Sequence, residues 1–254
     1  MLRALGRAAI IPPQCWLLAV AAGGCLASVT LPPQASLSAL CGSLGRVPIA
    51  DWPMLMGLVW SPISLALAWL VMLTATMPPL LAEPVRHVWH ASMPVRRAWA
   101  VLLFALGYLL LWMLAGVILV PTALRISAML PEGTAAAISL GLALIWSASP
   151  SAQQARNKCH RTLRIGAHGW RADLECLLYG MHVGTACVWL CWPWMLAPMM
   201  FESGHVAAMI SVGLWLLLDR LFPPRRPCWR LPPPLGELVW RFRTSSAIRN
   251  PAPR

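Results

Sequence analysis

The stretch AWAVLLFALGYLLLWMLAGVILV, from Ala98 to Val120, decides the class of fold, because its 23 residues include no Asp, Glu, Lys or Arg. Each residue of an α-helix adds about 1.5 Å along the axis, so about 20 apolar residues cross the roughly 30 Å hydrocarbon core of a bilayer. The sequence therefore predicts a membrane-spanning helix here, closed by Pro121.

Five further uncharged stretches flank this one. Only 11% of the residues are charged and 59% are hydrophobic, whereas about 25% of residues are charged in a soluble domain. These features predict an all-α, polytopic transmembrane bundle of about six spans over residues 14–222, with an N-terminal segment 1–13 and a basic tail 223–254. The other spans are expected at about Gln14–Leu31, Trp52–Ala82 (stopping at Pro78-Pro79), Thr134–Gln153, Cys176–Phe201 and Ser203–Leu218, the last being short.

The basic residues predict the orientation of this bundle. With the N-terminus in the cytoplasm, 18 of the 20 Arg and Lys residues fall on the cytoplasmic side, and only Arg46 and Arg125 fall outside. This is the distribution that the positive-inside rule describes, and it predicts that both termini are cytoplasmic. The net charge of +12 thus reports orientation in a lipid bilayer, and no nucleic-acid-binding motif accompanies it.

The N-terminus allows one alternative. Arg3 and Arg7 followed by an apolar run also resemble a signal peptide, whose removal would leave five spans. Pro12-Pro13 interrupts the run and favours a retained helix.

The sequence carries no signature of an enzyme. It has no Gly-rich phosphate loop, no nucleophile elbow and no pair of acidic residues at the three- or four-residue spacing that would place them on one helix face. It is rich in soft metal ligands instead, with 8 Cys, 13 Met and 6 His. We therefore expect a protein that is not an enzyme.

The strongest group of candidate ligands lies in the fifth span. At about 100° per residue, Gly180, Gly184, Cys187 and Cys191 form one stripe along the helix. Small residues four apart allow a second helix to approach closely, so the stripe is expected to face the interior of the bundle. Two thiolates one turn apart could hold Cu(I) or Zn(II) with a third ligand from elsewhere. The alternative is that both cysteines only pack, as small hydrophobic residues.

Four residues are second-tier ligand candidates. Met195 extends the stripe by one turn, and His182 is an ionisable residue within the span, on nearly the opposite face from Cys187. Met72 and Met77 precede Pro78 in the second span and could ligate copper or fill space in the core. On the predicted cytoplasmic loops, the His87/His90 pair and Cys159-His160 are interpreted as solvated.

The order of several short motifs resembles a known family. These are Met72-x4-Met77-Pro78, Gly107-Tyr108-x3-Trp112, Trp146-x2-Ser149-Pro150 with Lys158-Cys159-His160, and the segment from Gly180 to Met195. Together they resemble a bacterial family of predicted metal-binding integral membrane proteins that carry a domain of unknown function and are sometimes labelled copper chaperone-like. The resemblance covers residues 52–222 and implies a location in the bacterial inner membrane.

The sequence departs from the family pattern at three places. Thr76 stands where a Met is usual, Ser147 replaces a Gln, and Trp189 and Leu190 occupy positions of small residues between the two cysteines. Two functions from different classes therefore stay open. One is binding or relaying of a soft metal ion such as copper. The other is a metal-free membrane scaffold or assembly subunit that contacts another membrane protein.

Overall fold

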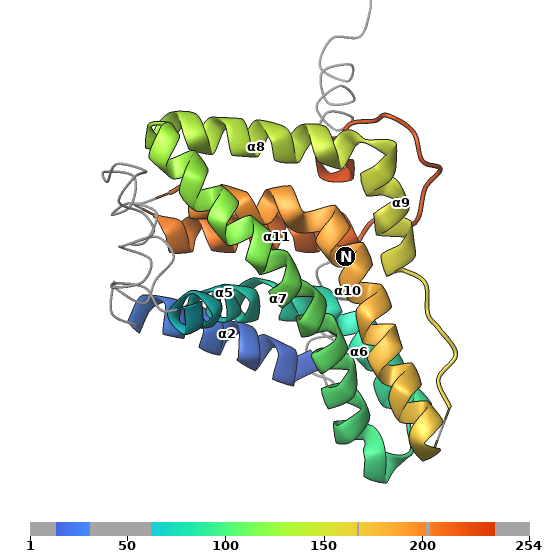
Figure 1. Ribbon diagram of the computed structural model, residues 1–254. Coiled ribbons are helices and arrows are strands. Elements are labelled where there is room, and N and C mark those ends of the chain that lie inside the picture. Colours follow the sequence, from blue (N-terminus) through green and yellow to red (C-terminus); the bar gives the residue numbers. More distant parts are fainter. Residues whose placement is uncertain (1–13, 31–61, 167, 202–203, 237–254) are drawn as a thin grey trace, which may run out of the picture.

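The computed structural model describes residues 14–30, 62–166, 168–201 and 204–236 (Figure 1). The described residues form helices and no strands, which confirms the all-α class. The predicted N-terminal segment 1–13 and residues 237–254 of the tail lie outside them. The α-helices are α2 (Gln14–Thr30), α5 (Pro62–Thr76), α6 (Ala82–Ala91), α7 (Arg97–Met129), α8 (Glu132–Ala148), α9 (Pro150–Cys159), α10 (Gly169–Met199) and α11 (His205–Arg220); 3₁₀ turns occupy Pro78–Leu81 and Pro94–Arg96.

Helices α7 and α10 are long and apolar enough to cross a membrane. Up to four spans result when two bent helix pairs, 63–91 and 133–159, are each counted as one. Helix α2 is apolar but shorter, and the 16 residues of α11 extend only about 24 Å. The number of six spans therefore stays a prediction.

The prediction that Pro121 closes the third span is wrong. Helix α7 continues through Pro121 to Met129. Proline removes one backbone hydrogen bond, but an end at this point would leave several backbone groups unsatisfied in apolar surroundings, so the helix continues.

The predicted span Thr134–Gln153 is not one straight helix, because the chain bends by 72° between α8 and α9. Ser149 has extended backbone angles (φ −75°, ψ 153°), as expected before Pro150. Its hydroxyl accepts a hydrogen bond from Ala152 N at 3.2 Å and so caps α9. A second bend, of 57°, follows Thr76 at the predicted Pro78-Pro79 stop. Beyond it, the segment interpreted as a solvated loop around His87 and His90 is the amphipathic helix α6.

Glycines bring α7 and α10 into close contact along the axis of the fold (Figure 1). A Cβ atom on Gly180 would lie 2.1 Å from the Phe104 carbonyl oxygen, and one on Gly107 would lie 2.2 Å from that of Leu177. One on Gly184 would lie 3.2 Å from the Tyr108 carbonyl oxygen. The predicted small-residue stripe of α10 is thus the surface on which α7 packs.

We expect Gly180→Ala to destabilise the protein by about 1–3 kcal/mol, because the added methyl group meets backbone and not a movable side chain. Thermal unfolding in detergent measures the effect. Gly141→Ala in α8 is the matched control, since nothing lies within 4 Å of its added Cβ. Equal midpoints for the two variants would contradict the close crossing of α7 and α10.

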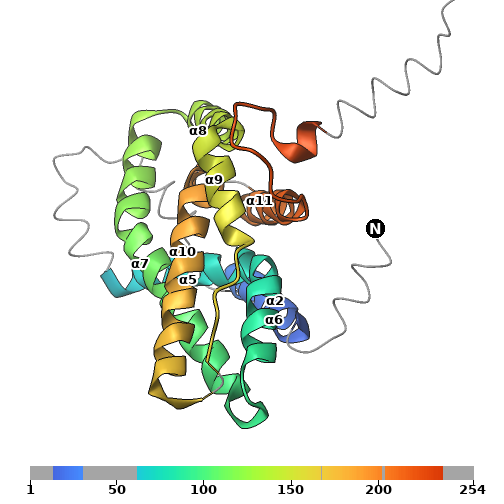
Figure 2. The ribbon, with the colours of Figure 1, turned by 90° about the vertical axis from the view of Figure 1, so that its right-hand side faces the viewer.

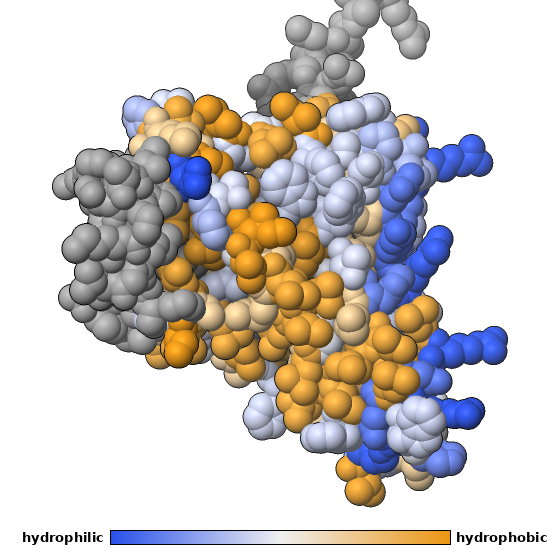
Figure 3. Space-filling view, viewed as in Figure 1, coloured by the Kyte–Doolittle hydropathy of each residue, from blue (hydrophilic) through white to orange (hydrophobic). Residues whose placement is uncertain are grey.

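The surface divides into an apolar area and a hydrophilic edge. Hydrophobic side chains cover much of the face in Figure 3, and hydrophilic ones gather along the edge where α9 and segment 160–166 lie in Figure 1. Exposed Leu106, Leu110, Leu114 and Val117 extend along α7, while Arg161 and Arg164 are exposed on segment 160–166. This arrangement suits helices in lipid with one edge at the aqueous interface.

Candidate metal centre

Cys187 and Cys191 form a buried pair of thiols on the face of α10 that meets α7. Both side chains are 0% exposed, and their Sγ atoms lie 3.8 Å apart. This separation is too long for a disulfide, which requires about 2.05 Å, and both cysteines are free. The prediction that both sulfurs face the interior of the bundle is confirmed.

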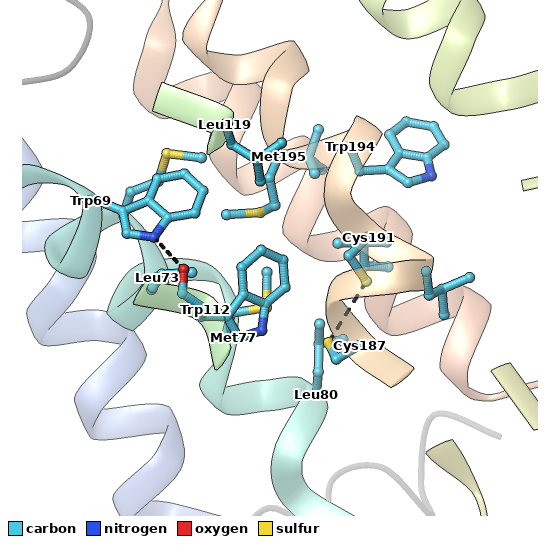
Figure 4. Packing of buried hydrophobic residues seen from close by; sticks show 14 of the residues in the cluster. Trp69, Leu73, Met77, Leu80, Trp112, Leu119, Cys187, Cys191, Trp194 and Met195 are labelled. Atoms are coloured by element: carbon cyan, nitrogen blue, oxygen red, sulfur yellow. Dashed lines mark hydrogen bonds between the residues drawn. The ribbon is translucent and has the colours of Figure 1, made fainter. Parts of the chain in front are cut away.

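Helix α7 supplies polar groups to this thiol pair. The Tyr108 hydroxyl donates a hydrogen bond to Cys187 Sγ at 3.2 Å. The Trp112 indole is fully buried, and its Nε1–H has no hydrogen-bond acceptor among the described residues. In Figure 4 this nitrogen lies on the side of the ring nearer Cys187. A buried donor without an acceptor is destabilising, so the site is suited to a sulfur that accepts hydrogen bonds, as a thiolate does.

Three methionines lie in the same buried core. Met72 of α5, Met77 directly after that helix and Met195 of α10 are buried with the two cysteines, and Figure 4 shows Met77 and Met195. Trp69 Nε1 donates to the Trp112 carbonyl oxygen at 2.9 Å and so fastens α5 to α7. Five of the six predicted ligands therefore lie in one core.

Thr76 links α5 to the methionine of the stripe. Its hydroxyl lies 2.9 Å from the Met72 carbonyl oxygen and 4.0 Å from Met195 Sδ. The family that the sequence resembles has a Met at the position of Thr76. This departure from the family pattern therefore lies next to the candidate ligand Met195.

His182 does not join this group. Its side chain is partly exposed, and its Nε2 atom is buried without a partner in the described part of the chain. No contact connects it with the thiol pair, as its position on nearly the opposite face of the helix predicts.

The composition of the core limits the kind of metal that it could hold. Within the described ranges, no three His, Cys, Asp or Glu side chains come together in a metal-binding arrangement. A structural zinc site requires four such ligands. Two thiolates with a thioether are the donor set that this core offers, and soft donors of this kind select Cu(I).

Arg220, the last residue of α11, places a positive charge close enough to the thiol pair to act on Cys187 and Cys191. Its side chain is partly exposed. Its Nε is buried and makes no hydrogen bond to any described residue. A positive charge at this position compensates negative charge on the sulfurs.

A second group of soft ligands lines a cavity of about 430 Å³ that includes His87, His90, Cys159, His160 and Tyr179. His87 is engaged, since its Nε2 lies 2.8 Å from the Leu163 carbonyl oxygen. Partial removal from water and the charges of Arg220 and Arg156 lower the pKa of His160 below its usual value. These residues come from three sequence-distant segments, so their proximity follows from the fold, and Cys159, interpreted as solvated from the sequence, is buried.

Sequence reasoning assigned no role to Tyr108, Trp112, Thr76 or Arg220. For Tyr108 and Trp112 a signal was present in the sequence, because both belong to a motif on which the family resemblance rests. Nothing in the sequence distinguishes Arg220 from the many other basic residues near the predicted cytoplasmic side.

Comparison with known proteins identifies a family. The model of the family described as PpoB2, copper chaperone, matches residues 66–240. This range contains the thiol pair, Tyr108, Trp112, Arg220 and the candidate ligands Met72, Met77 and Met195. No curated protein matches the chain, and no solved structure does.

Proposed function

The chain belongs to the PpoB2 family of copper chaperones, and from this premise we propose that it binds Cu(I) as cargo through Cys187 and Cys191, within the bilayer. The observation that carries the proposal is the geometry of the pair. The two buried sulfurs lie 3.8 Å apart, and Cys187 Sγ accepts a hydrogen bond from the Tyr108 hydroxyl. Met195, Met72 and Met77 are the proposed thioether donors, and His182 has no part in the site.

Charge balance favours Cu(I) over Zn(II). Two thiolates with Cu(I) carry one net negative charge, which the single positive charge of Arg220 neutralises. Two thiolates with Zn(II) are already neutral, so Arg220 would become an uncompensated cation close to the metal. Because uncompensated charge is costly in apolar surroundings, the site should prefer the monovalent ion.

The proposed role is non-catalytic and requires the protein to be embedded in a membrane. We place it in the bacterial inner membrane as a multi-pass protein with both termini in the cytoplasm. The apolar surface of α7 and the hydrophilic edge along α9 support this placement. A soft ion bound within the bilayer is shielded from water and from hard ligands that compete for it. This shielding suits a protein that holds Cu(I) before passing it to a partner.

We expect Arg220→Gln to lower the affinity for Cu(I) about tenfold and to leave Zn(II) affinity unchanged or higher, since the compensating charge is lost. Competition titrations of the detergent-purified protein, against a Cu(I) chelator and against a Zn(II) indicator, measure both affinities.

Arg161→Gln is the matched control, because it removes the same charge from an exposed position. An equal decrease for both metals in the Arg220→Gln variant would show that the guanidinium does not set the choice of ion. Purified wild-type protein that takes up neither metal would favour the scaffold function instead.

A further inference from the structure

Beyond the thiol pair, the first part of the tail folds back onto the bend between α8 and α9 (Figure 2). The Asn157 side chain holds it, since Nδ2 donates to the Arg225 carbonyl oxygen at 2.7 Å and Oδ1 accepts from Arg225 N at 3.2 Å. Arg230 N donates to the Ala148 carbonyl oxygen at 3.1 Å. These contacts fix the tail segment 225–230 along α9, from Asn157 near the end of that helix to Ala148 before its start.

This folding creates a strongly positive cleft. Its lining includes Arg156, Arg225, Arg226 and Arg230, and no acidic residue is among the described residues that line it. Ser149 and Gln153, at the N-terminal end of α9, also line it. That end adds the positive pole of a helix dipole to the guanidinium charges.

Arg156 provides an unsatisfied donor at the base of the cleft. Its side chain is 1% exposed; Nε donates to Asp219 Oδ2 at 2.8 Å, and Nη1 donates to Gln153 Oε1 at 2.5 Å. Its Nη2 and the Asp219 Oδ1 atom are both buried and make no hydrogen bond to any described residue. Asp219 balances the charge of Arg156, so the charges of Arg225, Arg226 and Arg230 remain for another partner.

We propose that this cleft binds a phosphate-type anion. Because the Arg156 side chain is only 1% exposed, the anion would lie at the mouth of the cleft, against the three tail arginines, whose planar donors match phosphate geometry. The anion is either the headgroup of an anionic lipid or free phosphate. The hydrophilic edge near α9 is where lipid headgroups would meet the protein.

The test compares three probes by the thermal stability of the detergent-purified full chain. They are short-chain phosphatidylglycerol, short-chain phosphatidylcholine and inorganic phosphate. The variant R225Q/R226Q/R230Q removes the mouth of the cleft and leaves the Arg156–Asp219 pair intact. The matched control R161Q/R164Q/R171Q removes the same charge from exposed positions outside the cleft.

Stabilisation by phosphatidylglycerol alone would assign the site to a lipid headgroup, and stabilisation by inorganic phosphate as well would assign it to the phosphate group itself. In either case the half-saturating concentration should rise at least about tenfold in the cleft variant and stay within about twofold of wild type in the control. If both triple variants lose affinity for the probe equally, the anion is attracted to basic charge in general and not to the cleft, and the proposal is overturned. Failure of every probe to stabilise the wild-type protein would overturn it too.

Discussion

Replacing Cys187 and Cys191 together by Ser is expected to lower the affinity for Cu(I) by about 100-fold or more. The change keeps the size of the side chains but replaces both soft thiolates by hydroxyls, which Cu(I) does not select. Neither sulfur is in a disulfide, so the substitution breaks no covalent link. Competition titration with a chromophoric Cu(I) chelator measures the loss.

Cys176→Ser is the matched control for this experiment. Cys176 is also buried and free on the same face of α10, but it lies eleven positions before Cys187, which is about 16 Å along the helix axis and too far to share a metal ion with the pair. The control should retain wild-type affinity. If both variants bind Cu(I) equally well, the thiol pair only packs and the scaffold function gains support.

Asp219→Asn is expected to destabilise the protein by about 3–5 kcal/mol. Asp219 Oδ2 accepts from Arg156 Nε at 2.8 Å, and both side chains are buried. The substitution leaves the guanidinium of Arg156 as a buried charge without a counter-ion, which is the costly way to break such a pair. Unfolding by increasing denaturant in detergent micelles gives the free energy.

Two further variants separate this explanation from a general loss of packing. Glu83→Gln removes an acid from the exposed pair with Arg86 and should change stability by less than about 1 kcal/mol. The double variant R156M/D219L removes both charges and should recover most of the lost stability. A double variant as unstable as Asp219→Asn would indicate that lost hydrogen bonds or shape, and not the isolated charge, cause the effect.

The sequence predicted those helices whose limits depend on local composition. The limits of α2 and the end of α10 follow from uncharged runs and from flanking residues, whereas α10 begins at Gly169, seven residues before the predicted start at Cys176. The stripe of Gly180, Gly184 and Cys187 was also readable, because helical periodicity places them on one face, and that face is where α7 packs. Local pattern was sufficient in these cases because close packing needs small residues at fixed spacing.

The two prolines of the third and fourth spans show where local pattern fails. Pro150 follows Ser149, whose hydroxyl caps the next helix, so the chain can break there with its backbone groups satisfied. Pro121 follows the buried apolar residue Val120, which offers no such cap, and α7 continues. The same residue type has opposite effects because the outcome depends on whether the freed backbone groups find partners.

The surroundings of the candidate metal centre could not be predicted, because they depend on contacts between distant segments. Tyr108 reaches Cys187 from a helix 79 positions away in sequence, and Arg220 approaches the thiols from the end of α11. The tail arginines likewise meet Arg156 only after the chain has folded back. Such pairings follow from tertiary structure, and no spacing rule within one helix reports them.

X-ray absorption at the copper edge tests the central claim most directly. For the Cu(I)-loaded wild-type protein we expect scattering from sulfur atoms in the first coordination shell, and we expect its amplitude to fall in the C187S/C191S variant, which retains only thioether sulfurs. A first shell of nitrogen and oxygen alone in the wild-type protein, or the same sulfur shell in both proteins, would contradict the assignment of Cys187 and Cys191 as ligands.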